Sequence, residues 1–357
     1  MKIKNSKKDI NKIISTSIAK TKCVLFTDPK EIFYLTNADF CGFWFLYVVD
    51  KAYVICSKMV ENQAREFFFE INTADIYVSV YFYKTVLEIL KKNNAKKLFI
   101  DPKYMIALDF IVLSEKLSQN GIEVKKKIGI LDSARMIKKN NEIENLKKSC
   151  KIVSSICDTV RKELKSGLSE LDVHYKILEL FLKNHVTESF TPIVAFGKNS
   201  ANPHHRSSGK KLVQNDIVMI DIGCIYNGYC SDLTRTYFLD KVDDNRKHIW
   251  NVVKHSQEAV LKGIRAGLPI AWADKTARNV IESAGYKDKF IHTIGHGVGI
   301  EIHETPSLSS NAEGVFFTGM TVTVEPGIYI KQKFGVRIED TILIKEDGCE
   351  VLTSATY

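Results

Sequence analysis

The feature that most constrains this chain is a set of four carboxylates and one imidazole, each within or at the end of its own apolar stretch. The five residues are Asp221, Asp232, His296, Glu325 and Glu339, in the segments IDIG, SDLTRT, GHGVG, VEPGIYI and GVRIEDT. Burying a carboxylate is costly unless a cation or hydrogen bonds compensate it. Oxygen ligands with one imidazole suit a pair of Mn²⁺, Co²⁺ or Zn²⁺ ions better than a structural zinc, which favours Cys and His. The set therefore predicts a two-metal hydrolytic site and a fold that brings these five residues together.

The length of 357 residues is enough for two domains, each with its own hydrophobic core. The net charge of +9 raises the question of nucleic-acid binding. The lysines, however, are scattered along the chain and do not alternate with aromatic residues in any one segment. We therefore expect no nucleic-acid partner.

The cysteines and the N-terminal segment indicate a reducing compartment. None of the eight cysteines forms a CxxC pair, and several lie in apolar runs such as AYVIC and CVLF, as buried thiols do. The segment MKIKNSKKDINKI is charged and lacks the apolar core of a signal peptide. The longest apolar stretch, Phe43–Val49, is too short to cross a bilayer. These features predict a cytoplasmic protein with no membrane partner.

The first third of the chain alternates between strand-like and helix-like segments. Apolar and β-branched runs predict strands at 23–27, 43–49, 52–56, 76–80, 97–101 and 122–127. Apolar residues at three- and four-residue spacing predict helices at 57–70, 84–93 and 104–118. This alternation is typical of an α/β domain with a mixed sheet. Because no histidine precedes His174, we expect residues 1–130 to serve as a scaffold, an assembly element or a lid.

A break near residues 129–132 separates this domain from residues 131–357. A long amphipathic helix is predicted over 138–164, and Ser169 with Asp172 forms a capping box that opens a second helix over 170–184. The remainder consists of β runs (PIVAFG, DIVMIDIG, LTRTYFL, TVTVEPGIYI and GVRIEDTILI) interrupted by helices at 244–265 and 271–284. Helices beside a mainly antiparallel sheet predict an α+β domain.

A hairpin is predicted to bring the two aspartates together. The pair Asn227-Gly228 lies between two β runs and is a strong signal for a type I′ turn. With those two residues as the loop, Asp221 faces Thr234, and Asp221 and Asp232 become diagonal neighbours on one face of the hairpin, about 7–8 Å apart. Like charges at this separation favour a cation between them.

The other candidates lie in three further segments. His292, His296 and His303 are interspersed with glycines 295, 297 and 299, which we expect to let the backbone pass close to a ligand. Glu325 ends an apolar strand, and Glu339 lies within another strand two residues after Arg337, which can pair with Glu339 or with substrate. The last two histidines of interest, His204 and His205, follow the loop GKNSANP. The sequence is equally consistent with a functional role for them and with a place in an ordinary surface loop.

The ordered segments FTPIVAFGKNSANPHH, DIGCIYNGYCSDLTRTYF, FIHTIGHGVGIEIHETP, GMTVTVEPGIYI and GVRIEDTILI cover nearly all of the second domain. Together they resemble metallopeptidase family M24, the pita-bread family of methionine aminopeptidase, aminopeptidase P and prolidase. The stretch DPKEIFYLTNADFCGF resembles the creatinase-type N-terminal domain of the proline-specific branch. The resemblance implies a creatinase-like α/β domain at 1–130 and an α+β pita-bread catalytic domain at 131–357.

The resemblance also implies roles for the site residues. Asp221 would hold one ion, Asp232 and Glu339 would bridge two ions, and His296 with Glu325 would hold the other. The metals would be divalent, Mn²⁺ first and Co²⁺ or Zn²⁺ as alternatives. A bridging water or hydroxide would be the nucleophile, with Glu325 as the proton shuttle.

Further residues match supporting positions of the family. His292 and His303 would hydrogen-bond the scissile carbonyl and the tetrahedral intermediate. His204 would assist substrate binding and proton handling. Tyr329 and Arg337 would support the site from outside the metal ligands.

One departure bears on the substrate. Many dipeptidases of the family carry Arg directly after the HExP segment, where it grips the free carboxylate of a dipeptide, whereas this chain has Ser307. This favours an Xaa-Pro aminopeptidase that acts on proline-containing peptides, with an Xaa-Pro dipeptidase as the alternative. A non-catalytic pita-bread binding module and a metal-free C–N hydrolase of the creatinase type are further alternatives, disfavoured because all five ligands are present. The resemblance also implies a homodimer.

Overall fold

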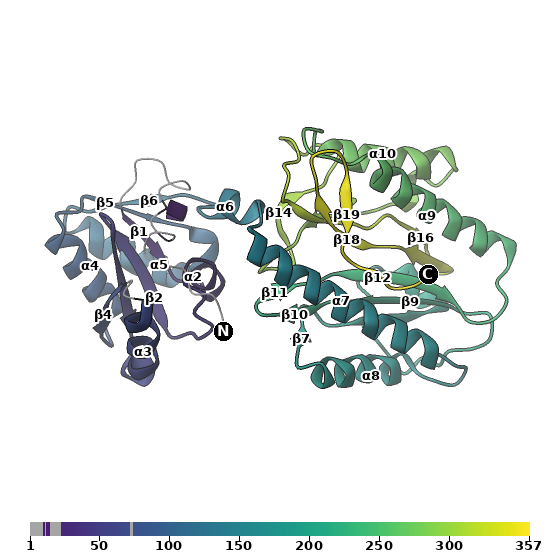
Figure 1. Cartoon of the computed structure of the whole chain (residues 1–357), viewed down its shortest axis with the longest axis horizontal. Helices are drawn as coiled ribbons and strands as arrows, with labels where there is room; N and C mark the ends of the chain where they lie inside the picture. The colour runs from purple at the N-terminus through teal and green to yellow at the C-terminus, as the bar shows by residue number, and fades with distance from the viewer. Residues whose placement is uncertain (1–9, 11, 15–22, 72–73) are drawn as a thin grey trace. The chain divides into compact units, whose positions relative to one another are not determined.

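The computed structural model describes residues 10, 12–14, 23–71 and 74–357. The chain divides into two compact units, Met1–Arg135 and Met136–Tyr357, which differ in colour in Figure 1. The division falls in the short helix α6 (Asp132–Met136), a few residues after the predicted boundary between 130 and 131. Within the described ranges, no helix is both long enough and apolar enough to cross a membrane.

The first unit is built on a mixed sheet of six strands in the order β4-β3-β2-β1-β5-β6. Strand β2 runs antiparallel to β1 and β3, while the β3–β4, β1–β5 and β5–β6 pairs are parallel. All six predicted strands are present, as β1 (Cys23–Phe26), β2 (Phe43–Val48), β3 (Lys51–Cys56), β4 (Ala74–Val78), β5 (Lys97–Ile100) and β6 (Glu123–Lys126). The predicted α/β domain with a mixed sheet is confirmed.

Helices α3 (Glu61–Ile71), α4 (Phe82–Lys92) and α5 (Ala107–Ser118) match the three predicted helices of this unit. Helices α4 and α5 bury apolar residues against the sheet, among them Val86, Leu90, Leu113 and Leu117. Helix α2 (Pro29–Thr36) was not among the predictions, although it has a clear start. The Asp28 side chain caps it by accepting from the backbone N–H groups of Lys30 and Glu31, and Pro29 occupies the first turn.

The second unit begins with helices α7 (Asn140–Glu163) and α8 (Glu170–Lys183), which pack on an antiparallel sheet of β8 (Ile193–Phe196), β9 (Ile217–Ile222) and β12 (Leu233–Phe238). The predicted capping box of α8 is present: the Ser169 hydroxyl accepts from the Asp172 N–H, and the Ser169 N–H donates to the Asp172 carboxylate. A small sheet of β7 (Thr187–Glu188), β10 (Cys224–Tyr226) and β11 (Tyr229–Cys230) extends this half, which has its own apolar core.

The other half carries α9 (Asp244–Gly263) and α10 (Ala271–Ser283), which match the two predicted helices. They pack on a five-stranded sheet in the order β14-β13-β15-β18-β19 and on the β16–β17 hairpin. These strands are β13 (His296–Gly297), β14 (Glu304–Ser307), β15 (Thr321–Val324), β16 (Gly327–Ile330), β17 (Phe334–Arg337), β18 (Asp340–Ile344) and β19 (Cys349–Val351). A second apolar core fills the space between these helices and strands.

Two of the β runs each form two strands, and both breaks occur at predicted ligand carboxylates; the break at Glu325 was predicted as a strand end, and the break at Glu339 was not. The run TVTVEPGIYI splits into β15 and β16 at Glu325-Pro326, and GVRIEDTILI splits into β17 and β18 at Ile338-Glu339. The prediction that Glu339 lies within a strand is therefore wrong. Proline lacks the N–H that a ladder requires, and the breaks lie together because the Ile338 N–H donates to the Pro326 carbonyl. The chain changes sheets at both points, which leaves the two carboxylates at strand ends.

Candidate metal centre

The hairpin between β9 and β12 has the predicted turn and register. Asn227 and Gly228 both have positive φ, 48° and 84°, as a type I′ turn requires. Asp221 pairs with Thr234, and Ile222 pairs with Leu233. Asp232, directly before β12, therefore shares a face with Asp221, as the sequence predicted.

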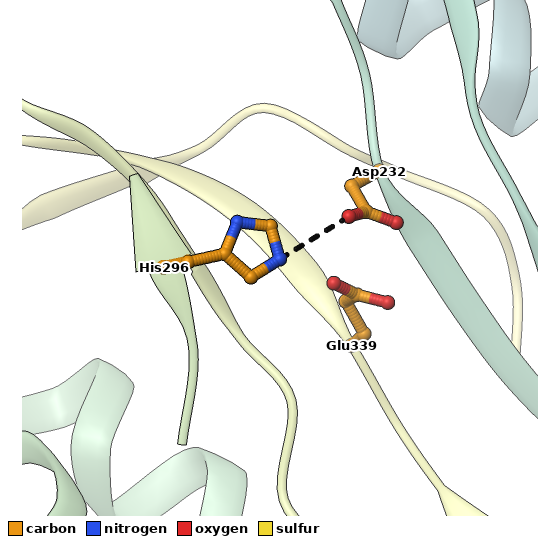
Figure 2. A group of neighbouring side chains, drawn as sticks. All are labelled: Asp232, His296 and Glu339. Carbon is orange, nitrogen blue, oxygen red and sulfur yellow. Dashed lines mark ion pairs between the residues drawn. The ribbon is translucent and has the colours of Figure 1, made fainter. Parts of the chain in front are cut away.

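Residues from both halves of the second unit meet at the centre. Asp232 from the first half approaches His296 and Glu339 from the second, with one potential ligand atom of each lying within 4.8 Å of the others. Figure 2 shows the three side chains converging from separate segments of the chain, and the His296 Nε2 atom lies 3.6 Å from Asp232 Oδ2. Three of the five predicted ligands thus form one compact group.

Glu325 completes the group on the side of His296. Its Oε1 lies 3.4 Å from His296 Nε2. The Thr323 hydroxyl donates to this Oε1 at 3.1 Å and accepts from the His296 N–H at 3.0 Å. Thr323 therefore sets the relative position of both residues. The sequence marks Thr323 only by its place two residues before Glu325, near the end of β15.

The tautomer of His296 directs a lone pair into this group. The Nδ1 atom lies 3.1 Å from the Gly297 carbonyl, which can only accept, so Nδ1 carries the proton. Burial lowers the pKa of His296 to about 4, which keeps the ring neutral near pH 7. Nε2 therefore presents a lone pair toward the oxygens of Asp232 and Glu325. Such an arrangement is repulsive unless a cation or a proton lies between them.

The carboxylates show the same surplus of negative charge. Burial raises the pKa values of Asp232, Glu325 and Glu339, and neighbouring carboxylates raise them further. Asp221 Oδ1 and Glu339 Oε1 are buried yet have no hydrogen-bond partner among the described residues. Buried, unpartnered oxygens beside an imidazole lone pair are the ligand set that divalent cations prefer. The residues present therefore fit a metal centre.

Asp221 is joined to the group through Arg337. The Arg337 Nη2 donates to Asp221 Oδ2, and its Nε donates to the Thr234 hydroxyl at 3.0 Å. That hydroxyl in turn donates to Glu339 Oε2 at 2.7 Å. Arg337 therefore pairs with Asp221 and not with Glu339, which was the pairing considered from sequence. Its remaining Nη1 donates to the Tyr329 hydroxyl at 2.9 Å, so its donors are largely engaged within the protein.

Tyr329 connects Arg337 to His292, whose Nε2 lies 3.0 Å from the tyrosine oxygen. The His292 Nδ1 donates to the Thr293 carbonyl at 2.8 Å, so Nε2 accepts from the Tyr329 hydroxyl. Burial and the charge of Arg337 lower the pKa of His292 to about 4. The Tyr329 ring lies over Gly327 and Gly335, where an added Cβ would come within 2.7 Å of it.

The two remaining predicted histidines lie on the solvent side of the centre. His303 is exposed, and its ring meets that of His296 edge-on with centroids 4.3 Å apart. His204 is also exposed and lies close enough to His292 and His303 to lower their pKa values. His205 points elsewhere: its Nε2 bonds the buried carboxylate of Glu170 at 2.8 Å. Of this pair, only His204 faces the centre.

The glycines of GHGVG allow close contacts within the protein, and the approach to a ligand stays a prediction. None of Gly295, Gly297 and Gly299 has a positive φ. An added Cβ would lie 2.1 Å from the Thr323 carbonyl oxygen at Gly295 and 2.5 Å from that of Thr305 at Gly297. The close approach is therefore between neighbouring strands of the protein. This close packing lets β13 run directly beside β14 and β15. His296 in β13 therefore reaches Asp232 and Glu325.

Comparison with known proteins agrees with this geometry. Residues 144–346 match the model of metallopeptidase family M24, and residues 17–137 match the creatinase/prolidase N-terminal domain. The Xaa-Pro dipeptidase of Pyrococcus furiosus is 33% identical over 332 residues, which cover 92% of this chain and 92% of that protein.

Solved structures give the same result. The Xaa-Pro dipeptidase of Bacillus anthracis superposes with a TM-score of 0.93 at 30% identity and covers 98% of both chains. The X-Pro aminopeptidase of Thermotoga maritima superposes with a TM-score of 0.86 at 26% identity, covering 96% of this chain and 98% of its own. The chain therefore belongs to metallopeptidase family M24, with a pita-bread catalytic unit preceded by a creatinase-type N-terminal domain.

Proposed function

We propose that this metallopeptidase is an Xaa-Pro dipeptidase that works with two divalent metal ions, Mn²⁺ foremost. The observation that carries the proposal is the similarity along nearly the whole chain to proteins named Xaa-Pro dipeptidase. The site supports it, because its buried carboxylates and imidazole can hold cations. This choice departs from the aminopeptidase favoured by the sequence. The relatives fit the dipeptidase alternative better.

We assign the metal ions to the five residues predicted as ligands: Asp221, Asp232, His296, Glu325 and Glu339. When bound, the ions would supply Lewis acidity and a water nucleophile of lowered pKa. The chain's own residues fix the ligand atoms. Thr323 orients Glu325, and Thr234 orients Glu339. Arg337 donates to Oδ2 of Asp221, which leaves Oδ1 without a hydrogen-bond partner among the described residues. We assign proton transfer to the carboxyl of Glu325.

The histidines share the work on the substrate in this proposal. His303 is exposed beside His296 and is free to donate to the oxygen of the scissile bond. His292 carries its proton on Nδ1 and accepts from Tyr329 at Nε2, so Nε2 must gain a proton before it can donate to substrate. His204 lies on the solvent side, where it can contact substrate as it enters.

A specific observation favours the Xaa-Pro aminopeptidase as second candidate. Ser307 pairs directly with His296 across β13 and β14 and is exposed, so the side chain at this position lies next to the metal ligand. A serine there offers no charge for a dipeptide's carboxylate. Arg337, the other cation considered for that role, is buried and bonded to Asp221 and Tyr329.

The experiment compares peptides that share their first two residues. The purified chain, loaded with Mn²⁺, is given Leu-Pro and Leu-Pro-Ala, and kcat/KM is measured for both. The proposal expects the dipeptide to be preferred, and a preference for the tripeptide would instead support the aminopeptidase. Ser307→Arg should improve the dipeptide by about 1–2 kcal/mol, the range of a charge-assisted contact, and leave the tripeptide nearly unchanged.

The homodimer implied by the resemblance stays a prediction. Size-exclusion chromatography with light scattering would test it. A mass near the 40.5 kDa of one chain would contradict it.

A further inference from the structure

Helix α10 carries an ion pair that faces the histidine segment, formed by a buried Asp274 and a partly exposed Arg278. Arg278 Nε donates to Asp274 Oδ2 and Nη2 donates to Oδ1, both at 2.9 Å, in a bidentate pair one helical turn apart. The side chain of Asp274 is only 1% exposed. We refer to Asp274 and Arg278 together as the α10 clamp. A two-bond pair of this kind fixes the orientation of both groups.

The α10 clamp holds three backbone groups of one short segment. Arg278 Nη1 donates to the Phe290 carbonyl at 2.8 Å, and Nη2 donates to the His292 carbonyl at 3.0 Å. Asp274 Oδ1 accepts from the Ile294 N–H at 3.1 Å. The guanidinium also lies over the Phe290 ring, 4.4 Å from its centroid. The clamp thus bonds every second residue from 290 to 294.

This segment has no secondary structure to position it. Residues 290–295 belong to no helix or strand, yet they carry His292 and lead directly into His296. The ring of His292 is bonded on its other side to Thr293 and Tyr329. Backbone bonds to Glu325 and Leu308 also hold the segment at Ile294, and the clamp adds the bond to the His292 carbonyl, directly at the residue that carries the imidazole.

We propose that Asp274 and Arg278 are positioning residues for His292. They touch neither the substrate nor the proposed metals, and they act by holding the His292 carbonyl so that the imidazole stays in line with Tyr329. The inference rests on the proposed function, since it assumes that His292 contributes to hydrolysis. A displacement of about 1 Å at a reacting group costs on the order of a hundredfold in rate.

The test is a double-mutant cycle between Arg278 and His292 in the full-length, Mn²⁺-loaded chain. Arg278→Met removes all the guanidinium bonds but keeps a long side chain. Arg278→Lys keeps the charge beside Asp274 but cannot reach both carbonyls with fixed geometry. The control is Lys262→Met, which removes a Lys–Glu pair of the same helical spacing from α9. Melting temperature and bound Mn²⁺ are measured for each variant.

We expect kcat to fall about tenfold to a hundredfold in Arg278→Met and by less in Arg278→Lys, with KM changed less than kcat and Mn²⁺ retained. Lys262→Met should match the parent. In the His292→Ala background, Arg278→Met should cause no further loss of kcat, because its effect passes through the imidazole. If Arg278→Met lowered kcat equally in the parent and in His292→Ala, the proposal would be overturned. It would also be overturned if Arg278→Lys and Arg278→Met both kept the kcat of the parent.

A second measurement separates this inference from the proposed function. The His292 ring signal, identified by its disappearance in His292→Ala, is followed by NMR in histidine-labelled protein. Arg278→Met should shift that signal while the Lys262→Met control leaves it in place, whether or not the chain cleaves Xaa-Pro. An unmoved signal refutes the clamp. An inactive parent protein with a shifted signal refutes only the proposed function.

Discussion

Thr234 and Thr323 each place a hydroxyl between two polar partners at the metal centre. Thr234 accepts from Arg337 and donates to Glu339, while Thr323 accepts from the His296 N–H and donates to Glu325. A hydroxyl has one proton and two lone pairs, so it can join a fixed donor to an acceptor. Each threonine thereby fixes the orientation of its carboxylate in the site.

Removal of the Asp232 carboxylate should abolish most of the hydrolytic activity. In the proposed site, Asp232 would hold the metal ions together with the other four ligands, so Asp232→Ala would remove one of the four carboxylates that offset their positive charge. We expect turnover to fall by at least about a thousandfold. The measurement is kcat on Leu-Pro together with bound Mn²⁺ per chain. Near-normal turnover would exclude the two-metal assignment.

His303→Ala should separate chemistry from metal binding. The ring of His303 is exposed and lies beside His296, and in our assignment it contacts substrate but no metal. We expect kcat to fall about 10²–10³-fold, as when an oxyanion donor is removed, with Mn²⁺ content unchanged. Loss of metal from this variant would make His303 a ligand and contradict the assignment.

At the scale of elements, the position of β13 depends on the glycines on either side of His296, which have no Cβ. In Gly295→Ala the new methyl group would lie 2.1 Å from the Thr323 carbonyl oxygen, so β15 would have to move away from His296. We expect a loss of about 1–3 kcal/mol in unfolding free energy, the usual cost of overpacking, together with weaker Mn²⁺ binding. Chemical denaturation and metal titration would measure both.

The matched control is Gly209→Ala, since nothing lies within 4 Å of a Cβ at that position. This variant should leave unfolding and metal binding as they are in the parent. Equal effects from Gly295→Ala and Gly209→Ala would show that the tight passage of β13 is unimportant.

Local signals made several elements predictable from sequence. Asn227-Gly228 specified a turn, and the turn fixed the register of Asp221 against Thr234. Ser169 with Asp172 specified the start of α8. In each case the information lies within a few residues, so no knowledge of the rest of the fold is needed. The four carboxylate candidates could be proposed for a similar reason, because a carboxylate in an apolar run requires compensation.

Other features were not predictable, because they depend on contacts between distant segments. The break at Ile338-Glu339 arises where the chain leaves the β16–β17 hairpin and enters β18 of the five-stranded sheet. The partner of Arg337 is Asp221, more than a hundred residues away, although Glu339 is its near neighbour in sequence. The α10 clamp likewise joins a helix to an irregular segment.

At the scale of the whole molecule, we expect the catalytic unit to be separable. The division after Arg135 leaves all five proposed ligands in one unit with its own cores. The fragment 131–357 should therefore fold and bind Mn²⁺, even if substrate affinity suffers. Isothermal titration calorimetry checks this. A folded fragment that binds no Mn²⁺ would contradict the division.

The stability of the first unit should depend on pH through Glu31. Burial, with Asp101 and Asp28 nearby, raises the pKa of this carboxyl to about 8 from 4.5. An acid with a raised pKa in the folded state stabilises that state fully below pH 4.5, and the contribution is lost as pH rises through 8. Glu31→Gln should therefore become stabilising relative to the parent as pH rises.

The measurement is calorimetric unfolding of both proteins between about pH 5 and 9, because the raised pKa predicts a difference that grows across this window. Glu66→Gln, on the exposed side of α3, is the control and should show no such trend. A difference between Glu31→Gln and the parent that is constant with pH would refute the prediction.

The catalytic unit has two apolar cores, and neither half holds a full set of ligands. Asp221 and Asp232 come from one half, and His296, Glu325 and Glu339 come from the other. An ion that binds residues of both halves would stabilise the arrangement in which the two halves are packed together. By linkage, that packed arrangement would strengthen ion binding by the same free energy. At a metal concentration a hundred times the Kd, this amounts to about 2.7 kcal/mol. The metal would then stabilise the packing of the two halves as well as support catalysis. In a cell short of Mn²⁺, the two halves of the catalytic unit would separate more readily.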